Sequence, residues 1–155
     1  MAGVSEEKYD CIRLENQLCF PLYACAKEVV RQYRKPLEEL NLTYTQYVVM
    51  MVLWEHGAMT EGELGRRIHL DSGTLAPLLK RLEKTGYILR KRPENNERKL
   101  FVTLTKQGER LKEKAITVPY AVTGCLDLSQ TELEQLKGLL DKALLKMEEK
   151  NDLRL

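Results

Sequence analysis

Positively charged side chains gather between residues 80 and 99, where they could bind a polyanion. This stretch holds eight Lys or Arg and three Glu, a local charge of +5, whereas the whole chain of 155 residues carries only +2. The remainder of the chain therefore sums to −3, and the positive field is concentrated in one segment. Such a segment favours the phosphates of a nucleic acid, although charge alone leaves a solvated surface as the alternative.

Cysteines are the second group of residues with chemistry to offer, because a thiolate can attack a peroxide or a disulfide. The chain has four of them, at Cys11, Cys19, Cys25 and Cys125. Their spacing is irregular, no CxxC pair occurs and the chain has only two histidines, so we predict no metal site and no cofactor. Judged by pattern alone, Cys19 lies on or beside an apolar helical stripe, where a cysteine is ordinarily a small buried side chain.

A helix that stops at about Gly86 is predicted to position the first cations of the basic segment. Its apolar stripe consists of Leu75, Leu78, Leu79 and Leu82, and its outward face carries Gly73, Thr74, Pro77, Lys80, Arg81 and Lys84. The leucine spacing of i, i+3, i+4 and i+7 requires that stripe to pack on the domain, which leaves the cations facing outward. Pro77 leaves two starts open for this helix, at Ser72 or near Pro77 itself.

Neighbouring segments complete a recognisable motif. Thr60 and Glu63 have capping-box spacing at the start of a short helix, and residues 69–71 form a turn. Residues 87–92 and 98–105 alternate like two strands of a hairpin. Two helices joined by a tight turn and followed by a basic hairpin describe a winged helix-turn-helix, whose second helix enters the major groove. The predicted fold is mainly α with a small β-hairpin wing.

The two ends of the chain are predicted to form long amphipathic helices. Apolar residues from Leu14 to Tyr33 predict one helix with a kink at Pro21, and a second apolar seam follows Ser129 and extends to Met147. Together, the two seams present more apolar surface than one small winged unit can cover, although packing within the chain is an open alternative. We therefore predict a homodimer, joined through its N- and C-terminal helices, that presents two reading helices to a pseudo-palindromic site in double-stranded DNA.

The segments between these ends contain two further predicted helices. An apolar helix capped by Thr43 runs to Gly57 and must be buried on all sides. Another helix begins after Thr105, continues past Ala115 and is interrupted by Pro119.

Bulk properties predict a single domain over residues 1–155. Within it, we expect a DNA-binding lobe over about 42–116 and dimerisation helices over about 10–40 and 117–155. The sequence has no apolar run of 18 residues and no apolar N-terminal segment after a basic start, so we expect neither a membrane span nor a signal peptide. A cytoplasmic location and reduced cysteines follow from that expectation.

Four segments together resemble the MarR family of dimeric winged-helix regulators, and within it the organic hydroperoxide resistance (OhrR) subgroup. They are LENQLCFPLYACAKEV at 14–29, LTYTQYVVMMVLWEHG at 42–57, LDSGTLAPLLKRLEKTGYILRKR at 70–92 and ERKLFVTLTKQGERLKEKA at 97–115. The resemblance covers about residues 12–120. It implies a transcriptional repressor rather than an enzyme, with a reading helix that begins around Asp71.

The resemblance also implies which residues contact DNA. Ser72, Thr74 and their outward neighbours would contact the major groove, and Arg98 would enter the minor groove. From charge and geometry, the flanking phosphates attract Lys80, Lys84, Arg90, Lys91 and Arg92. Asn96 stands where the family wing usually has an aspartate, so a hydrogen bond would have to replace the ion pair that orients Arg98.

The same resemblance makes Cys19 a peroxide sensor, because LCFPLYA is similar to the reactive-cysteine motif of the subgroup. An organic hydroperoxide would convert Cys19 to a sulfenic acid, the dimer interface would repack, and DNA would be released. Tyr33 and Tyr44 stand where the family has tyrosines that bond this sulfur from the other subunit, and Tyr23 follows Cys19 by one turn. Either Cys125, as a resolving cysteine, or a low-molecular-weight thiol would then form a disulfide.

Three other interpretations stay open at this stage. A MarR-type repressor could sense a small aromatic ligand while Cys19 is merely packed, and a global stress or virulence regulator could share the cysteine motif. A thiol peroxidase is the remote alternative, because Pro119, Thr123 and Cys125 come near a peroxiredoxin pattern. Their spacing is short by one residue, and no thioredoxin-like βαβ pattern surrounds them.

Overall fold

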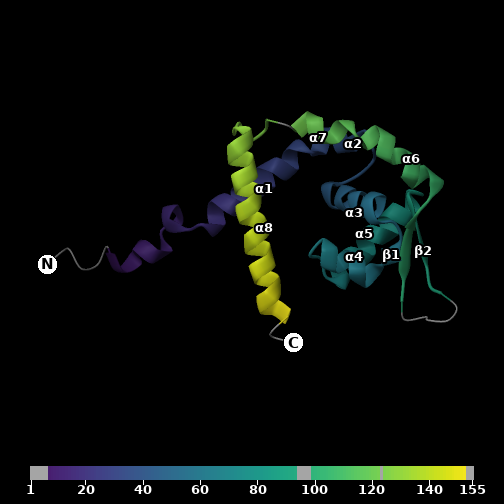
Figure 1. Ribbon diagram of the computed structural model, residues 1–155, viewed down its shortest axis with the longest axis horizontal. Helices are drawn as coiled ribbons and strands as arrows, with labels where there is room; N and C mark the ends of the chain where they lie inside the picture. Colours follow the sequence, from purple (N-terminus) through teal and green to yellow (C-terminus); the bar gives the residue numbers. More distant parts are fainter. Residues whose placement is uncertain (1–6, 94–98, 123, 153–155) are drawn as a thin grey trace. The chain divides into compact units, whose positions relative to one another are not determined.

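The computed structural model describes residues 7–93, 99–122 and 124–152. The chain divides into two units, one ending at Val122 and one beginning at Thr123 (Figure 1). The first unit contains every element up to α7, and the second contains the long helix α8. In the described part of the chain, no helix is both long and apolar enough to cross a membrane.

The first unit begins with two short 3-10 helices, η1 (Glu7–Ile12) and η2 (Leu14–Asn16), followed by α1 (Cys19–Gln32) and α2 (Arg34–Glu38). The prediction of one kinked helix from Leu14 to Tyr33 was wrong, because the α-helix begins only at Cys19. Pro21 is the third residue of α1, where its missing N–H costs no helical bond, so it starts the helix instead of kinking it.

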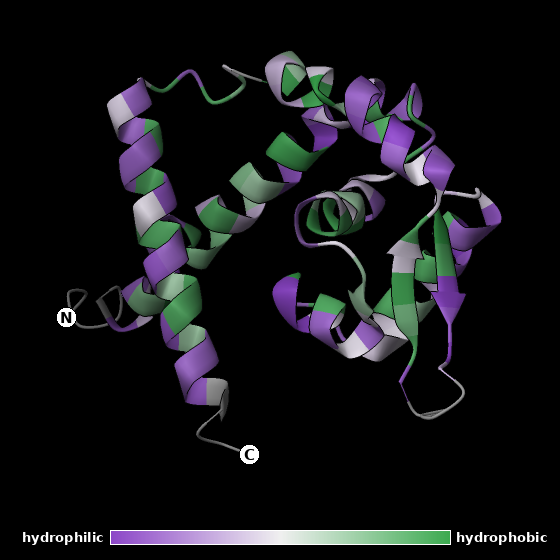
Figure 2. Cartoon of the chain, turned by 45° about the vertical axis from the view of Figure 1, so that its right-hand side comes forward, coloured by the Kyte–Doolittle hydropathy of each residue, from purple (hydrophilic) through white to green (hydrophobic). Residues whose placement is uncertain are grey.

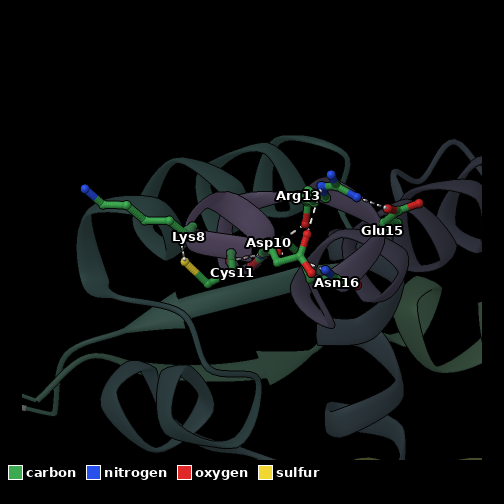
Figure 3. Close-up of polar contacts among 7 residues, drawn as sticks. Lys8, Asp10, Cys11, Arg13, Glu15 and Asn16 are labelled. Carbon is green, nitrogen blue, oxygen red and sulfur yellow. Dashed lines mark hydrogen bonds and ion pairs between the residues drawn. The ribbon is translucent and has the colours of Figure 1, made fainter. Parts of the chain in front are cut away.

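Local polar contacts hold the turns that precede α1. The side-chain amide of Asn16 donates to the carbonyl oxygen of Asp10 at 2.9 Å, and that of Gln17 donates to the carbonyl oxygen of Cys11 at 2.6 Å. Arg13 lies between two carboxylates, at 3.1 Å from Asp10 and 3.6 Å from Glu15 (Figure 3). These bonds satisfy backbone carbonyls that an α-helix would otherwise have paired.

The core of the first unit is built around α3 (Tyr44–His56). Thr43 and Gln46 form the predicted capping box, in which the Thr43 N–H donates to the Gln46 side chain at 2.8 Å. Val49, Met50 and Leu53 are fully buried, and Figure 2 shows the hydrophobic middle of α3 in green. The predicted central helix and its end at Gly57, with φ 74°, are therefore confirmed. The expected burial on all sides was wrong, because Met51 is 38% exposed.

The helix-turn-helix consists of α4 (Glu61–Arg67) and α5 (Ser72–Lys84). Thr60 and Glu63 form the second predicted capping box. Asp71 caps α5 by accepting the N–H of Thr74 at 2.9 Å, which confirms the earlier of the two starts and leaves Pro77 inside the helix. The predicted apolar stripe of α5 is buried and comprises Leu75, Leu78, Leu79 and Leu82.

A three-stranded antiparallel sheet follows the order β1 (Met59–Thr60), β3 (Phe101–Leu104), β2 (Ile88–Lys91). Strands β2 and β3 form the predicted hairpin, with Ile88 opposite Leu104 and Lys91 opposite Phe101. Strand β1 was not predicted, because two residues are too few to show an alternating pattern.

The first unit ends with α6 (Lys106–Ala115) and α7 (Thr117–Val122). Thr105 caps α6 as predicted, accepting the N–H of Gly108 at 3.0 Å. The predicted interruption at Pro119 was wrong, since the break falls at Ile116 and Pro119 lies in the first turn of α7, which tolerates proline.

The second unit consists of a turn and α8 (Gln130–Asp152). The N–H of Ser129 donates to the Glu132 carboxylate at 2.9 Å, so the predicted start of this helix is confirmed. The apolar seam of α8 includes exposed side chains, among them Leu136 at 38% and Met147 at 61%.

Candidate nucleic-acid interface and thiol site

The outward face of α5 carries the predicted groove contacts. They are Ser72, Gly73, Thr74, Pro77, Lys80, Arg81 and Lys84, and all seven are exposed. The geometry follows from the buried leucine stripe, which turns the opposite side of the helix toward solvent.

Asp71 organises the N-terminal turn of that face, and sequence reasoning missed it. Its carboxylate accepts the backbone N–H and the hydroxyl of Thr74, both at 2.9 Å. These two bonds from Thr74 hold the pKa of Asp71 below its usual value. Because the Thr74 hydroxyl donates to Asp71, its oxygen is presented outward as an acceptor. The Asp-x-x-Thr spacing at the helix start was the signal that could have identified this cap.

The cations of α5 carry uncompensated charge. Throughout residues 7–93, 99–122 and 124–152, no carboxylate lies within ion-pair distance of Lys80, Arg81 or Lys84. Lys80 and Lys84 are one helical turn apart on the same side of the helix. Such a row of free cations can follow a phosphate backbone.

The wing cations divide into two kinds. Lys91 and Arg92 are exposed, whereas Arg90 is largely buried and pairs with Glu83 at 2.9 Å. Arg90 therefore has a protein partner that its predicted role as a phosphate contact did not foresee. Arg98 and Asn96 lie outside the described residues.

Cys19 is exposed and is the first residue of α1. The residue before it, Leu18, provides no side-chain cap, so the free N–H groups of the first turn and the helix dipole face the vicinity of the sulfur. A negative group is favoured at such a helix terminus.

Two of the three predicted thiolate-stabilising tyrosines lie away from Cys19, since Tyr33 follows the far end of α1 and Tyr44 begins α3. Tyr33 and Tyr44 pack edge to face, with ring centroids 5.0 Å apart. Cys19 and Tyr33 stand at opposite ends of the 14-residue helix α1, about 21 Å apart along its axis. Within one chain, Tyr33 therefore cannot reach the sulfur of Cys19. Tyr23 is on α1 itself and is 64% exposed.

Two further aromatic residues extend this pair into the core, and sequence reasoning did not single them out as part of it. Tyr47 lies 6.1 Å from Tyr33 and 6.3 Å from Trp54, measured between ring centroids. Burial raises the pKa of Tyr47. The Trp54 indole N–H donates to the carbonyl oxygen of Gly108 at 2.9 Å, which ties the cluster to α6.

The remaining cysteines are also exposed. Cys125 lies in the turn that precedes α8, in the second unit. Cys11 and Cys25 lie in η1 and α1 of the first unit. Across the described ranges, no three His, Cys, Asp or Glu side chains are grouped as a metal ion would require.

Comparison with known proteins supports a regulatory role. Residues 31–115 match the family described as Transcriptional regulator SarA/Rot. The chain is 46% identical to the organic hydroperoxide resistance transcriptional regulator of Bacillus subtilis over 146 residues, which is 94% of this chain and 99% of that protein.

Solved structures agree with that match. Reduced AbfR bound to DNA has a TM-score of 0.75 and 35% identity, over 92% of this chain and 97% of that one. AbfR is a protein of Staphylococcus epidermidis, and it has also been solved in an overoxidised form bound to DNA and in a disulfide form. A mutant of Escherichia coli MarR complexed with operator DNA has a TM-score of 0.72 and 25% identity, over 79% of this chain and 90% of that one.

Proposed function

The chain belongs to the MarR family of winged-helix DNA-binding transcriptional regulators, among the relatives of the organic hydroperoxide resistance regulators, and we propose that it is a repressor released from its operator when Cys19 is oxidised. The observation that carries this proposal is the exposed Cys19 at the first turn of α1, in a segment outside the helix-turn-helix. A modification there changes the protein without touching the DNA-reading residues.

The chemical step needs one organic hydroperoxide for each sulfur. The Cys19 thiolate attacks the terminal peroxide oxygen, the O–O bond breaks, and the departing alkoxide takes a proton and leaves as an alcohol. Sulfur is oxidised to a sulfenic acid and the peroxide is reduced. A second thiol then attacks the sulfenic acid, forms a disulfide and releases water.

We propose that the acting protein is a homodimer, in the cytoplasm, that binds a pseudo-palindromic operator. Leu18 is 84% exposed and the α8 seam is open to solvent, so both chain ends offer apolar surface that a second copy can cover. Residues of about 10–40 and 117–155 would form this interface, and about 42–116 the DNA-binding lobe. Two reading helices would then lie about 34 Å apart, one turn of B-DNA.

Dimerisation also supports the proposed roles of the tyrosines. Tyr33 and Tyr44 lie too far from their own Cys19 to bond it. In a dimer that pairs the α1 helices of two copies in opposite directions, the tyrosines of one copy can approach the sulfur of the other. Tyr23, one turn from Cys19 on its own helix, would complete the surroundings of the sulfur.

We propose that a disulfide, not the first oxygen atom, releases the DNA. The relative AbfR has been solved on DNA in reduced and in overoxidised form, and separately in a disulfide form. In this chain the second thiol is Cys125 or a low-molecular-weight thiol, and Cys125 is exposed in a turn, where a thiol can be attacked.

Operator release by oxidised protein tests this proposal. The assay is fluorescence anisotropy with DNA from the protein's own upstream region, in the presence of a low-molecular-weight thiol. We expect wild-type protein to lose operator DNA after one equivalent of cumene hydroperoxide, and Cys19→Ser to stay bound. A Cys25→Ser variant, also altered in α1, serves as the matched control and should respond like the wild type. Release of the Cys19→Ser protein by peroxide would contradict the proposal.

Intact-mass analysis identifies the second thiol. A cross-linked dimer that is lost in Cys125→Ser supports Cys125, whereas an adduct with added small thiol in both proteins supports a mixed disulfide. Sulfinic acid on Cys19 with DNA released would contradict the requirement for a disulfide.

One observation favours a second candidate function, the sensing of a small aromatic ligand. A cavity of about 250 Å³ lies between α3 and α5, lined by residues that include Gln46, Thr74 and Arg81. It is smaller than a typical ligand pocket, which holds about 300 Å³ or more. Operator release by salicylate with an unmodified Cys19 would support this function over the redox proposal.

A further inference from the structure

A single carboxylate joins the reading helix to the wing. The backbone N–H of Arg90 donates to Oε1 of Glu83 at 3.0 Å. Two nitrogens of the Arg90 guanidinium, Nε and Nη2, donate to the other oxygen, Oε2, at 3.0 and 2.9 Å. One residue of β2 thus places three donors on one residue of α5, and both carboxylate oxygens are used.

The surroundings of the pair make it stronger than a surface ion pair. The Arg90 side chain is 17% exposed and that of Glu83 is 34% exposed. The hydrogen bonds from the Arg90 side chain hold the pKa of Glu83 below its usual value. Charge-assisted bonds in a partly buried, fork-shaped arrangement are directional as well as strong.

The pair lies where α5 leads into the wing, so it can fix the direction of the wing. Glu83 lies in the last turn of α5, next to Lys84 on the outward face, and Arg90 is the third residue of β2. The six residues Lys84–Leu89 connect them and include Gly86 at φ +85°, a conformation that glycine adopts without strain. The bonds between Glu83 and Arg90 join the two ends of this connection. They therefore fix the direction of β2 relative to α5.

We propose that Glu83 is a positioning residue for DNA recognition, which fixes the wing against α5 so that the wing cations and the α5 cations meet the same duplex. The inference rests on the DNA-binding part of the proposed function, and it is independent of the chemistry of Cys19. In this proposal the partner of Arg90 is Glu83, and not a DNA phosphate as the sequence predicted.

Electrostatics and positioning predict effects of opposite sign for Glu83. Removal of a carboxylate from a DNA-binding lobe raises the net positive charge and frees Arg90, so charge alone predicts tighter binding to any DNA. Loss of positioning predicts weaker binding to the operator, because the wing contacts then need ordering on the duplex. The ratio of operator affinity to nonspecific affinity separates the two, since it falls only if positioning is lost.

The experiment measures dissociation constants for operator DNA and for a scrambled duplex, at one stated salt concentration, for wild type, Glu83→Ala, Arg90→Ala and the double variant. Glu113→Ala, which removes an exposed glutamate of α6, is the charge-matched control. We expect Glu83→Ala to lose tenfold or more of the operator-to-scrambled ratio, with scrambled binding unchanged or tighter. The double variant should lose no more of the operator-to-scrambled ratio than either single variant, because both substitutions break the same contact. Glu113→Ala should keep the wild-type ratio.

An unchanged or higher ratio for Glu83→Ala, or additive losses in the double variant, would overturn the proposal. Thermal denaturation shows that each protein is folded at the assay temperature, and Glu83→Gln is the second variant if Glu83→Ala is not. Its amide oxygen still accepts the N–H of Arg90 but lacks the charge, so we expect a smaller loss of the ratio. A wild-type protein without operator preference would instead refute DNA recognition itself.

Discussion

Substitution of Lys84 by alanine should reduce the salt dependence of DNA binding by a calculable amount. Lys84 lies in the last turn of α5, and within the described ranges no carboxylate neutralises it. Each phosphate contact contributes about 0.9 to the slope of log K against log salt concentration. A homodimer carries the substitution twice, so the slope should fall by about 1.8.

The corresponding change in affinity is large enough to measure. Between 50 and 200 mM salt, wild-type affinity should fall by about twelvefold more than that of the variant. The two proteins should therefore differ most at low salt, for operator and for scrambled DNA alike, because a phosphate contact carries no base information.

Fluorescence anisotropy at five salt concentrations provides the slopes. Lys114→Ala, which removes an exposed lysine of α6, is the matched control and should leave the slope at its wild-type value. An unchanged slope for Lys84→Ala, in a protein with wild-type thermal stability, would refute the assignment of this face of α5 to DNA.

Three other predictions concern the scaffold of the reading surface. Leu79→Ala should cost about 3 kcal/mol of unfolding free energy, because Leu79 is fully buried on the inner side of α5. Leu89→Ala, at an exposed site, should cost under about 1 kcal/mol. Similar costs for the two variants in urea denaturation would contradict the packing. Gly108→Ala should destabilise the lobe by about 3 kcal/mol, because a Cβ there would collide with the carbonyl oxygen of Tyr87; an unchanged melting temperature would refute this contact. The folded protein lowers the pKa of Glu83 from 4.5, so the ionised side chain contributes its full stabilisation above pH 4.5 and loses it as pH falls through the folded pKa. Glu83→Gln should therefore lose less unfolding free energy than wild type between about pH 5 and 3. Parallel curves of unfolding free energy against pH for the two proteins would contradict this prediction.

Local signals in the sequence predicted the helix-turn-helix well. The capping boxes at Thr43 and Thr60 and the buried leucine stripe of α5 involve residues three or four apart, which a helix brings together by its own geometry. The wing hairpin was also predicted, since alternation is a two-residue pattern.

The N-terminal helix was predicted too long because its pattern continues beyond the helix. Leu14 and Leu18 keep the four-residue spacing of the stripe, but the side chains of Asn16 and Gln17 bond carbonyls six residues earlier and stabilise 3-10 turns. Side chains that compete for backbone groups in this way are invisible to a count of apolar spacing.

The pairing of Glu83 with Arg90 could not be read from the sequence either. The two residues are seven apart and belong to different elements, and net charge counts them as cancelling without showing that they touch. Likewise, the grouping of Tyr33 with Tyr47 depends on how the α1–α2 segment packs on α3. Tertiary packing, which local patterns do not encode, decides both contacts.

A simultaneous titration of sulfur oxidation and DNA occupancy addresses the role of Cys19 in one sample. Increasing cumene hydroperoxide is added to the operator complex, and each point is divided between anisotropy and intact-mass analysis. We expect the fraction of bound DNA to fall in proportion to the fraction of Cys19 held in a disulfide. Complete conversion of Cys19 to a disulfide with the operator still bound would contradict control of DNA binding by this sulfur.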